Sequence, residues 1–192
     1  MQREQILDHA LNVLEQNGLA STSSLKILAE EMRLSEQQLE QFWADRDALL
    51  YDALQFHAQQ IDSWRQEVLQ NSALRPEQKL MARYEGLNEH VTKGRFPGCL
   101  FIAACSFFPE TDHPIHQLAE QQKLTSLELT RELLRDMDAD DADMVAQQME
   151  LIQEGCLSKL LVKRQLQDVS VAKRLAEDIL QVAQCRRNGA LS

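Results

Sequence analysis

Apolar residues recur at steps of three and four along nearly the whole chain, and this period constrains the fold more than any other feature. It is the spacing that places residues on one face of an α-helix. The first segment shows it at Ile6, Ala10, Val13 and Leu14, and a later one shows it at Leu50, Leu54, His57, Ile61, Trp64 and Val68. No stretch of useful length alternates between apolar and polar residues as a half-buried strand would. We therefore expect an all-α protein.

Glycine, proline and capping residues divide the chain into nine predicted helices, three short ones followed by six that are mostly longer. The chain has only six glycines and four prolines among 192 residues, so the breaks are easy to place. Gly18 ends the first helix, and Ser35 forms a capping box with Gln38 at the start of the third. The other breaks fall at residues 21–24, Asp45, Pro76, Gly94, Pro109, His113-Pro114 and the acidic turn 138–143.

Residues 25–43 have the pattern of a helix-turn-helix. This motif needs a small residue where its two helices cross, and apolar residues that hold the second helix on the first. Ala29 is the small residue, and the residues expected to face inward are Leu28, Met32, Leu34, Leu39 and Phe42. The outer face of the second helix then carries Glu36, Gln37, Glu40 and Gln41, with Gln38 toward one side. Glutamine pairs with adenine in the major groove and glutamate accepts from cytosine, so this face suits base contacts.

Groups that bind phosphates flank this outer face. Hydroxyls, helix N-termini and cations commonly hold the DNA backbone. The residues of these kinds at the edges of the motif are Thr22, Ser23, Lys26 and Arg46.

The same residues also fit a plain helical hairpin with a charged, solvated outer face. Residues 1–50 hold four basic and nine acidic side chains, and the whole chain has a formal net charge of -10, which opposes attraction to phosphates. Arg33 takes the turn position usually given to glycine, where a left-handed conformation costs about 1–2 kcal/mol. Two functions stay open: DNA binding, and a helical small-molecule or protein-binding dimer that has lost specific DNA binding.

The chain resembles the TetR family of transcriptional regulators. That family's N-terminal pattern has an apolar helix and a glycine, then Thr-Ser, a helix ending in Ile-Ala, a Ser-capped recognition helix, an aromatic pair, a basic-acidic pair and a leucine. The matching residues are Ile6, Ala10, Leu14, Gly18, Thr22-Ser23, Leu28-Ala29, Leu34-Ser35, Leu39, Phe42-Trp43, Arg46-Asp47 and Leu49. Residues 95–100 are similar to the segment before the sixth helix in many members. The chain departs from the family at Arg33 and Gln37, usually glycine, and at Glu40, usually tyrosine.

The resemblance implies a nine-helix, TetR-like architecture and a DNA-binding regulator, more commonly a repressor. Residues 1–47 are expected to form the helix-turn-helix domain, and residues 48–192 a larger helical domain for ligand binding and dimerisation. The expected DNA contacts are Thr22, Ser23, Lys26, Arg33, Ser35, Glu36, Gln37, Gln38, Gln41 and Arg46. A two-fold dimer requires a palindromic operator in double-stranded DNA, with half-sites about one helical turn, roughly 34–36 Å, apart.

In the family, the fourth to seventh helices enclose a pocket for a small molecule. The candidate lining residues here are His57, Ile61, Trp64, Tyr84, Asn88, Phe101 and Phe108. Ligand pockets are mostly apolar with aromatic walls, so we expect the unknown effector to be a small apolar or aromatic molecule. Each residue taken alone also fits an ordinary core position, with His57 as a hydrogen-bonded core histidine.

The eighth predicted helix is apolar on more than one face, and Gly155 permits the close approach of another helix. In the family, the last two helices form a four-helix dimer interface. We therefore expect a homodimer through the last two helices; the alternative is a helix buried within its own domain.

Other functional classes have little support in the sequence. His113 and His116 have a spacing suited to a metal but no third ligand, and the acidic turn 138–143 lacks the glycine and the final glutamate of a calcium loop. The chain has no phosphate-binding loop or nucleophile motif, so we expect neither an enzyme nor a cofactor.

The sequence also predicts a cytoplasmic protein without a membrane segment. The longest apolar run, Cys99 to Phe108, has about ten residues, whereas a bilayer span needs about twenty. The N-terminus lacks the features of a secretory signal. The four cysteines form no CxxC pair, and we expect them to be small buried hydrophobic residues.

Overall fold

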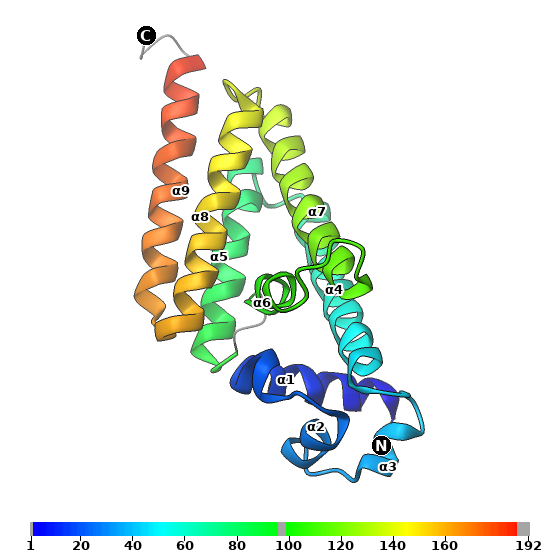
Figure 1. Ribbon diagram of the computed structural model, residues 1–192. Helices are drawn as coiled ribbons and strands as arrows, with labels where there is room; N and C mark the ends of the chain where they lie inside the picture. Colours follow the sequence, from blue (N-terminus) through cyan, green and yellow to red (C-terminus); the bar gives the residue numbers. More distant parts are fainter. Residues whose placement is uncertain (1, 96–98, 188–192) are drawn as a thin grey trace. The chain divides into compact units, whose positions relative to one another are not determined.

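The computed structural model describes residues 2–95 and 99–187, and within these ranges it consists of nine α-helices without a strand (Figure 1). The all-α expectation and the predicted order of three short helices and six mostly longer ones are confirmed, although the first helix is longer than predicted. The helices are α1 (Arg3–Ser21), α2 (Leu25–Glu31), α3 (Glu36–Glu40), α4 (Arg46–Gln70), α5 (Pro76–Thr92), α6 (Cys99–Phe107), α7 (Pro114–Asp136), α8 (Ala142–Lys163) and α9 (Leu166–Arg187). Residues 96–98, part of the segment similar to the family before α6, lie outside the described ranges.

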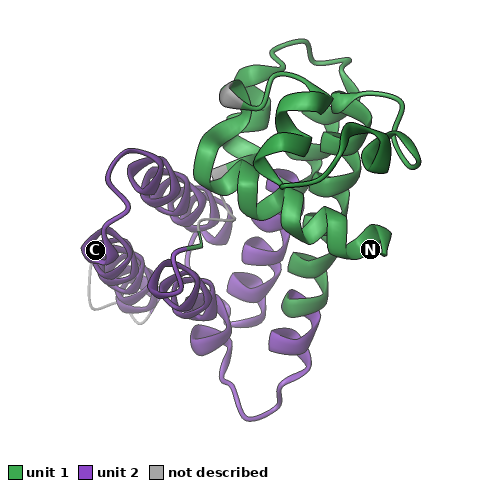
Figure 2. Cartoon of the chain, turned by 90° about the horizontal axis from the view of Figure 1, so that it is seen from below, with its two compact units in different colours: residues 1–64, 95–122 green, residues 65–94, 123–192 purple. Residues whose placement is uncertain are grey.

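The chain packs as two compact units, which Figure 2 colours separately. The first unit comprises residues 1–64 and 95–122, and its core joins α1, α2 and α3 to the first part of α4, α6 and the beginning of α7. α1 packs against both α2 and α6. Leucines dominate this core, and burying one leucine side chain contributes about 1.5–3 kcal/mol. Its most deeply buried leucines are Leu11, Leu14, Leu28, Leu39, Leu49, Leu50 and Leu54.

The second unit comprises residues 65–94 and 123–192, and its helices α5, α8 and α9 run side by side (Figure 1). A buried ionic network ties α5, α7 and α8 together. Arg83 Nη1 donates to Glu150 Oε1 at 2.5 Å, and Arg83 Nη2 donates to Thr130 Oγ1 at 2.5 Å. Burial alone would raise the pKa of the Glu150 carboxyl, but the Arg83 charge and the hydrogen bonds from Arg83 and Thr130 hold that pKa below its ordinary value.

Two backbone positions have positive φ angles that bear on the fold of the first unit. Gly18 (φ 77°, ψ 167°) interrupts α1, in a region that only glycine adopts readily, so the predicted helix break lies at the predicted residue. Regular helix resumes after Gly18 and α1 extends to Ser21. Arg33 has φ 56°, the left-handed conformation predicted for the turn of the helix-turn-helix.

The cysteines are less uniformly buried than predicted. Cys156 is buried, whereas Cys105 and Cys185 are only half-buried, and the side chain of Cys99 lies outside the described set. None of the helices in the described ranges is long and apolar enough to cross a bilayer.

Candidate nucleic-acid interface

Side-chain caps fix both helices of the helix-turn-helix. Ser24 Oγ accepts from Ile27 N at 3.2 Å at the start of α2. At the start of α3, Ser35 N donates to Gln38 Oε1 at 2.9 Å, so the predicted capping box is confirmed. Between the helices, Leu34 N donates to Ala29 O at 2.9 Å and closes the turn. Local hydrogen bonds therefore help to set the position of α3.

The inner face of α3 differs from the sequence-based expectation at one residue. Leu39 is buried as predicted, but Phe42 is 43% exposed and Trp43, at 3%, is buried in its place. The reason is that Trp43 N donates to Leu39 O at 3.0 Å, so Trp43, one full turn after Leu39, takes the inner position. Trp43 is held by its Nε1, which donates to Asp52 Oδ2 at 2.6 Å.

Most of the predicted DNA contacts lie on the surface of the first unit. The exposed ones are Ser23, Lys26, Arg33, Ser35, Glu36, Gln37, Gln38 and Gln41, and Glu40 is exposed beside them. They are supplied by α2, the turn and α3. The structure thus presents the outer face of α3 to solvent, with two cations at its edges.

The prediction that Thr22 and Arg46 contact DNA is corrected, because both side chains are buried and directed inward. Thr22 is 0% exposed, and its hydroxyl donates to the carbonyls of Gly18 and Leu19, each at 3.2 Å. Arg46 is 8% exposed, so neither side chain can reach a phosphate. These two side chains build the motif instead of contacting DNA.

Arg46 joins three parts of the first unit. Its Nε donates to Thr22 O at 2.9 Å and its Nη2 to Leu19 O at 2.8 Å, which satisfies the turn between α1 and α2. The guanidinium also lies over the rings of Phe107, at 5.1 Å, and Phe108, at 5.7 Å, at the end of α6. Sequence reasoning missed this role because the partners are distant along the chain, and no local signal marks them.

The aromatic candidates for an effector site form stacked pairs in the first unit. His57 of α4 is buried and stacks on Phe101 of α6, with ring centroids 5.3 Å apart and an interplanar angle of 9°. Phe108 is buried and stacks on His113 with centroids 4.4 Å apart. Ile61 and Trp64 are half-buried on α4.

The two candidates in the second unit differ from each other. Tyr84 is buried, its hydroxyl has no hydrogen-bond partner among the described residues, and burial raises its pKa to about 12. Asn88 is exposed, so the expectation that it lines a pocket is corrected. The buried stripe of α5 runs from Tyr84 past half-buried Leu87 to buried Val91, and Asn88 lies beside this stripe on the exposed face.

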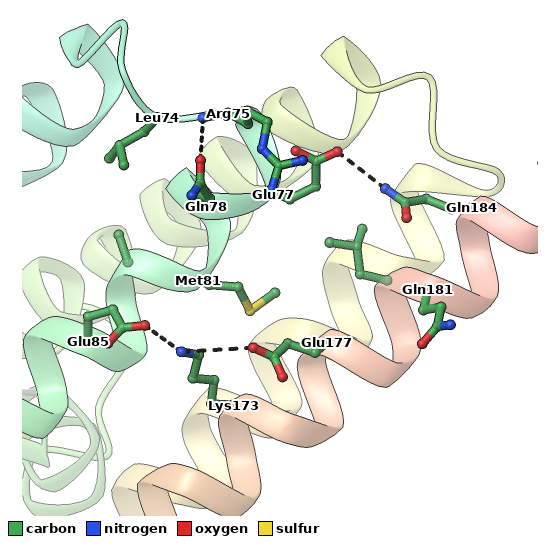
Figure 3. A pocket seen from close by; sticks show the side chains of 12 residues that line it. Leu74, Arg75, Glu77, Gln78, Met81, Glu85, Lys173, Glu177, Gln181 and Gln184 are labelled. Atoms are coloured by element: carbon green, nitrogen blue, oxygen red, sulfur yellow. Dashed lines mark hydrogen bonds and ion pairs between the residues drawn. The ribbon is translucent and has the colours of Figure 1, made fainter.

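A groove of about 650 Å³ lies in the second unit between α5 and α9 (Figure 3). Met81 and Leu180 supply apolar surface, and Lys173 bridges Glu85 at 2.5 Å and Glu177 at 3.9 Å. The residues lining the groove are Leu74, Arg75, Glu77, Gln78, Met81, Ala82, Glu85, Lys173, Glu177, Leu180, Gln181 and Gln184. None of the seven predicted pocket residues is among them, and the lining is charged rather than aromatic.

The last two helices carry apolar side chains on faces that are not covered within the chain. On α8, Leu151 is 68% exposed and Val162 is 79% exposed. Between them Gly155 is exposed, and a Cβ built on it would meet nothing within 4 Å. On α9, Val171, Leu175 and Val182 are exposed and spaced as one helical stripe, and Leu166 is exposed at the start of the helix.

Comparisons with known proteins agree with this architecture. No family model matches the chain. The chain is 52% identical, over all 192 residues and the full length of both proteins, to the HTH-type transcriptional regulator YjdC of Escherichia coli (strain K12), and equally to YjdC of Shigella flexneri. A TetR-family transcriptional regulator from Streptomyces coelicolor has a TM-score of 0.80 at 18% identity, covering 94% of this chain and 89% of that one. A TetR transcriptional regulator from Legionella pneumophila has a TM-score of 0.80 at 16% identity, covering 94% and 97%.

Proposed function

This chain belongs to the TetR family of helix-turn-helix transcriptional regulators, and we propose that it binds a palindromic operator in double-stranded DNA as a homodimer and represses transcription. Residues 1–47 form its DNA-binding domain, and residues 48–192 its ligand-binding and dimerisation domain. It acts in the cytoplasm, where its operator is found. The observation that carries this proposal is the capped helix-turn-helix, whose α3 is fixed by Leu39 and Trp43 and keeps its outer face in solvent.

The dimer forms through α8 and α9. Leu151 and Val162 on α8 and the stripe of Val171 and Leu175 on α9 leave apolar area in water unless a second copy covers it. Gly155 lets a partner helix approach the middle of this surface closely, because it has no side chain there. A two-fold dimer presents two identical copies of α3, and the operator is therefore palindromic.

The effector is a small apolar or aromatic molecule that binds at the stacked pair of His57 and Phe101. Flat aromatic surfaces offer stacking partners to such ligands. α6 carries Phe101 and ends at the rings that contact Arg46, and Arg46 in turn holds the turn before α2. A ligand that displaces α6 thereby changes the support of the helix-turn-helix.

Selection of genomic fragments by the purified protein tests the DNA-binding function. Fragments bound at low and moderate salt are sequenced, and the enriched sequence is used in a mobility-shift assay with competitor DNA. One palindromic site that survives competition is the expected result. No enrichment at any salt concentration would refute the proposal.

A second function is favoured by one observation, the acidic outer face of α3. Glu36 and Glu40 repel phosphates, and a chain that no longer binds DNA would act as a small-molecule or protein-binding dimer. The two functions differ in one readout. The second predicts a stable dimer in analytical ultracentrifugation together with no retarded band in the mobility shift.

Thermal shift assays test the effector. We expect indole or naphthol to raise the melting temperature of the wild-type protein, because a ligand of the folded state stabilises it. The shift should be lost in His57→Leu but kept in His90→Leu, which changes an exposed histidine of α5. Stabilisation by charged sugars alone, with no response to either aromatic compound, would refute an aromatic effector.

A further inference from the structure

The outer face of α3 presents two rows of side chains. Glu36 and Glu40 are one helical turn apart, and Gln37 and Gln41 form the adjacent row. Gln41 follows the last residue of the helix but keeps helical backbone angles, φ −63° and ψ −23°, so both rows are complete. All four side chains are exposed.

These four side chains do not contribute polar contacts to the fold of the described residues. Within the described residues, neither the two carboxylates nor the two amides make a hydrogen bond or an ion pair with another side chain. Gln38, the remaining glutamine of α3, is different, since its Oε1 accepts from Ser35 N at 2.9 Å and from Ser35 Oγ at 3.1 Å. The sequence offered five side chains of this outer face for base contacts. Among the described residues, the structure leaves four of them without a partner, the carboxylates of Glu36 and Glu40 and the amides of Gln37 and Gln41.

This set contains no cation, and that fact limits the bases it can bind. Guanine offers two acceptors, N7 and O6, in the major groove and is ordinarily bound by arginine or lysine. Cytosine offers the N4 amino donor to a carboxylate, and adenine offers N6 and N7 to a glutamine amide. A glutamate carboxylate placed next to guanine is repelled, because the carboxylate oxygens and guanine N7 and O6 are all acceptors.

We infer that the operator half-site of this chain is contacted at cytosine by Glu36 and Glu40, and at adenine rather than guanine by Gln37 and Gln41, because a glutamine amide makes two hydrogen bonds with adenine and only one with guanine. The inference rests on the proposed DNA-binding function. It adds which bases α3 selects and which it rejects.

Attraction to the DNA backbone then comes from the edges of the motif. Lys26 on α2 and Arg33 in the turn are exposed cations, and neither makes an ion pair within the described part of the chain. Phosphate contacts orient a protein on DNA, whereas base contacts specify sequence. The carboxylates of α3 weaken binding to unrelated DNA, so specificity comes from rejection as well as attraction.

Base analogues test this inference with the wild-type protein. The half-site is first selected from random double-stranded DNA, and each guanine and adenine is then replaced singly by its 7-deaza form, which lacks the N7 acceptor. We expect every 7-deazaguanine probe to bind as the unmodified site does, and 7-deazaadenine to weaken binding about tenfold or more at a contacted position. A tenfold loss with 7-deazaguanine at any half-site position would overturn the inference.

A variant pair tests the role of a single carboxylate. Glu40→Gln removes the charge but keeps the shape, and its amide can donate to guanine. We expect it to lose the preference for cytosine over guanine at one position of each half-site, a change of about tenfold to a hundredfold. Glu30→Gln is the matched control, because it makes the same charge change at an exposed residue of α2. The control should alter overall affinity without altering base preference.

The possible outcomes separate the inference from the function it depends on. A palindrome whose base preferences are the same in wild type and Glu40→Gln would leave a DNA-binding regulator but overturn the assignment of bases to α3. Failure to enrich any sequence would overturn both. Equal changes of base preference in Glu40→Gln and Glu30→Gln would attribute the effect to charge alone and overturn the direct contact.

Discussion

We expect Arg46 to contribute several kcal/mol to the free energy of unfolding of the first unit. The variant Arg46→Ala measures this contribution. The substitution removes two hydrogen bonds from a charged donor to the buried carbonyls Thr22 O and Leu19 O, and an ion pair with the exposed Asp47. Each such bond contributes about 1.5–3 kcal/mol. In Arg46→Ala, Leu19 O still accepts a hydrogen bond from the Thr22 hydroxyl. Thr22 O loses the hydrogen bond that it accepts from Arg46 Nε. The contacts with two aromatic rings add about 0.5–2 kcal/mol.

The lower end of this sum, about 4 kcal/mol, is the expected loss for Arg46→Ala, and it is a large part of the roughly 5–15 kcal/mol typical of a folded domain. Arg3→Ala is a matched control. Arg3 also forms an ion pair, with Asp52, and also lies over an aromatic ring, that of Trp43, but its side chain is 49% exposed. An exposed pair of this kind contributes less than about 1 kcal/mol.

Urea denaturation followed by tryptophan fluorescence is the assay. Both tryptophans of the chain, Trp43 and Trp64, belong to the first unit, so the signal reports on the unit that contains Arg46. At a slope of about 2 kcal/mol/M, Arg46→Ala should lower the midpoint by about 2 M, and Arg3→Ala by less than about 0.5 M. Midpoints for the two variants that agree within about 0.5 M would refute the argument that the buried carbonyls depend on Arg46.

Three further predictions concern the helix break, the dimer and the ionic network. Gly18→Ala should destabilise the first unit by about 1–3 kcal/mol in the same assay although the space around Gly18 is open, because φ 77° with ψ 167° is strained for alanine; an unchanged midpoint would contradict this. Leu151→Glu should give a monomer in sedimentation velocity, whereas Leu124→Glu, at an exposed leucine of α7, should leave the dimer intact; a dimer in both would move the interface elsewhere. Because Glu150 has a folded pKa below its unfolded value of about 4.5, its stabilisation is present above that value and is lost as the pH falls through the folded pKa. Acid titration by circular dichroism should show this loss in wild type and not in Glu150→Gln, and identical profiles would rule it out.

Local signals in the sequence were enough to predict the fold. Pro76 and Pro114 stand at the first position of α5 and α7, and the capping box of Ser35 and Gln38 starts α3. Each of these signals acts within four residues, a range over which the physics of helix ends is nearly independent of the rest of the chain. This is why the order of the nine helices, and most of their ends, could be predicted before any contact was known.

The roles of single side chains were harder to predict because they depend on distant partners. Arg46 has the residue type of a phosphate ligand, and only the rings of Phe107 and Phe108, far along the sequence, show that it is an interior residue. Thr22 is likewise buried by packing that its neighbours do not reveal. Phe42 was misplaced for a different reason, since Trp43, one full turn after Leu39, takes the inner position in its place.

The interior position of Arg46 also limits how fragments and chimeras of this protein can be designed. A fragment that stops at residue 47 keeps the guanidinium and the two carbonyls it binds, but loses the aromatic rings beneath it and the rest of the core contributed by α6. In a chimera that exchanges only the first 47 residues with a relative, the buried guanidinium of Arg46 would therefore pack against the aromatic rings and core residues of another protein. Residues 1–64 together with residues 95–122 form the compact unit that keeps Arg46 with these rings, so a transplanted module should include both segments.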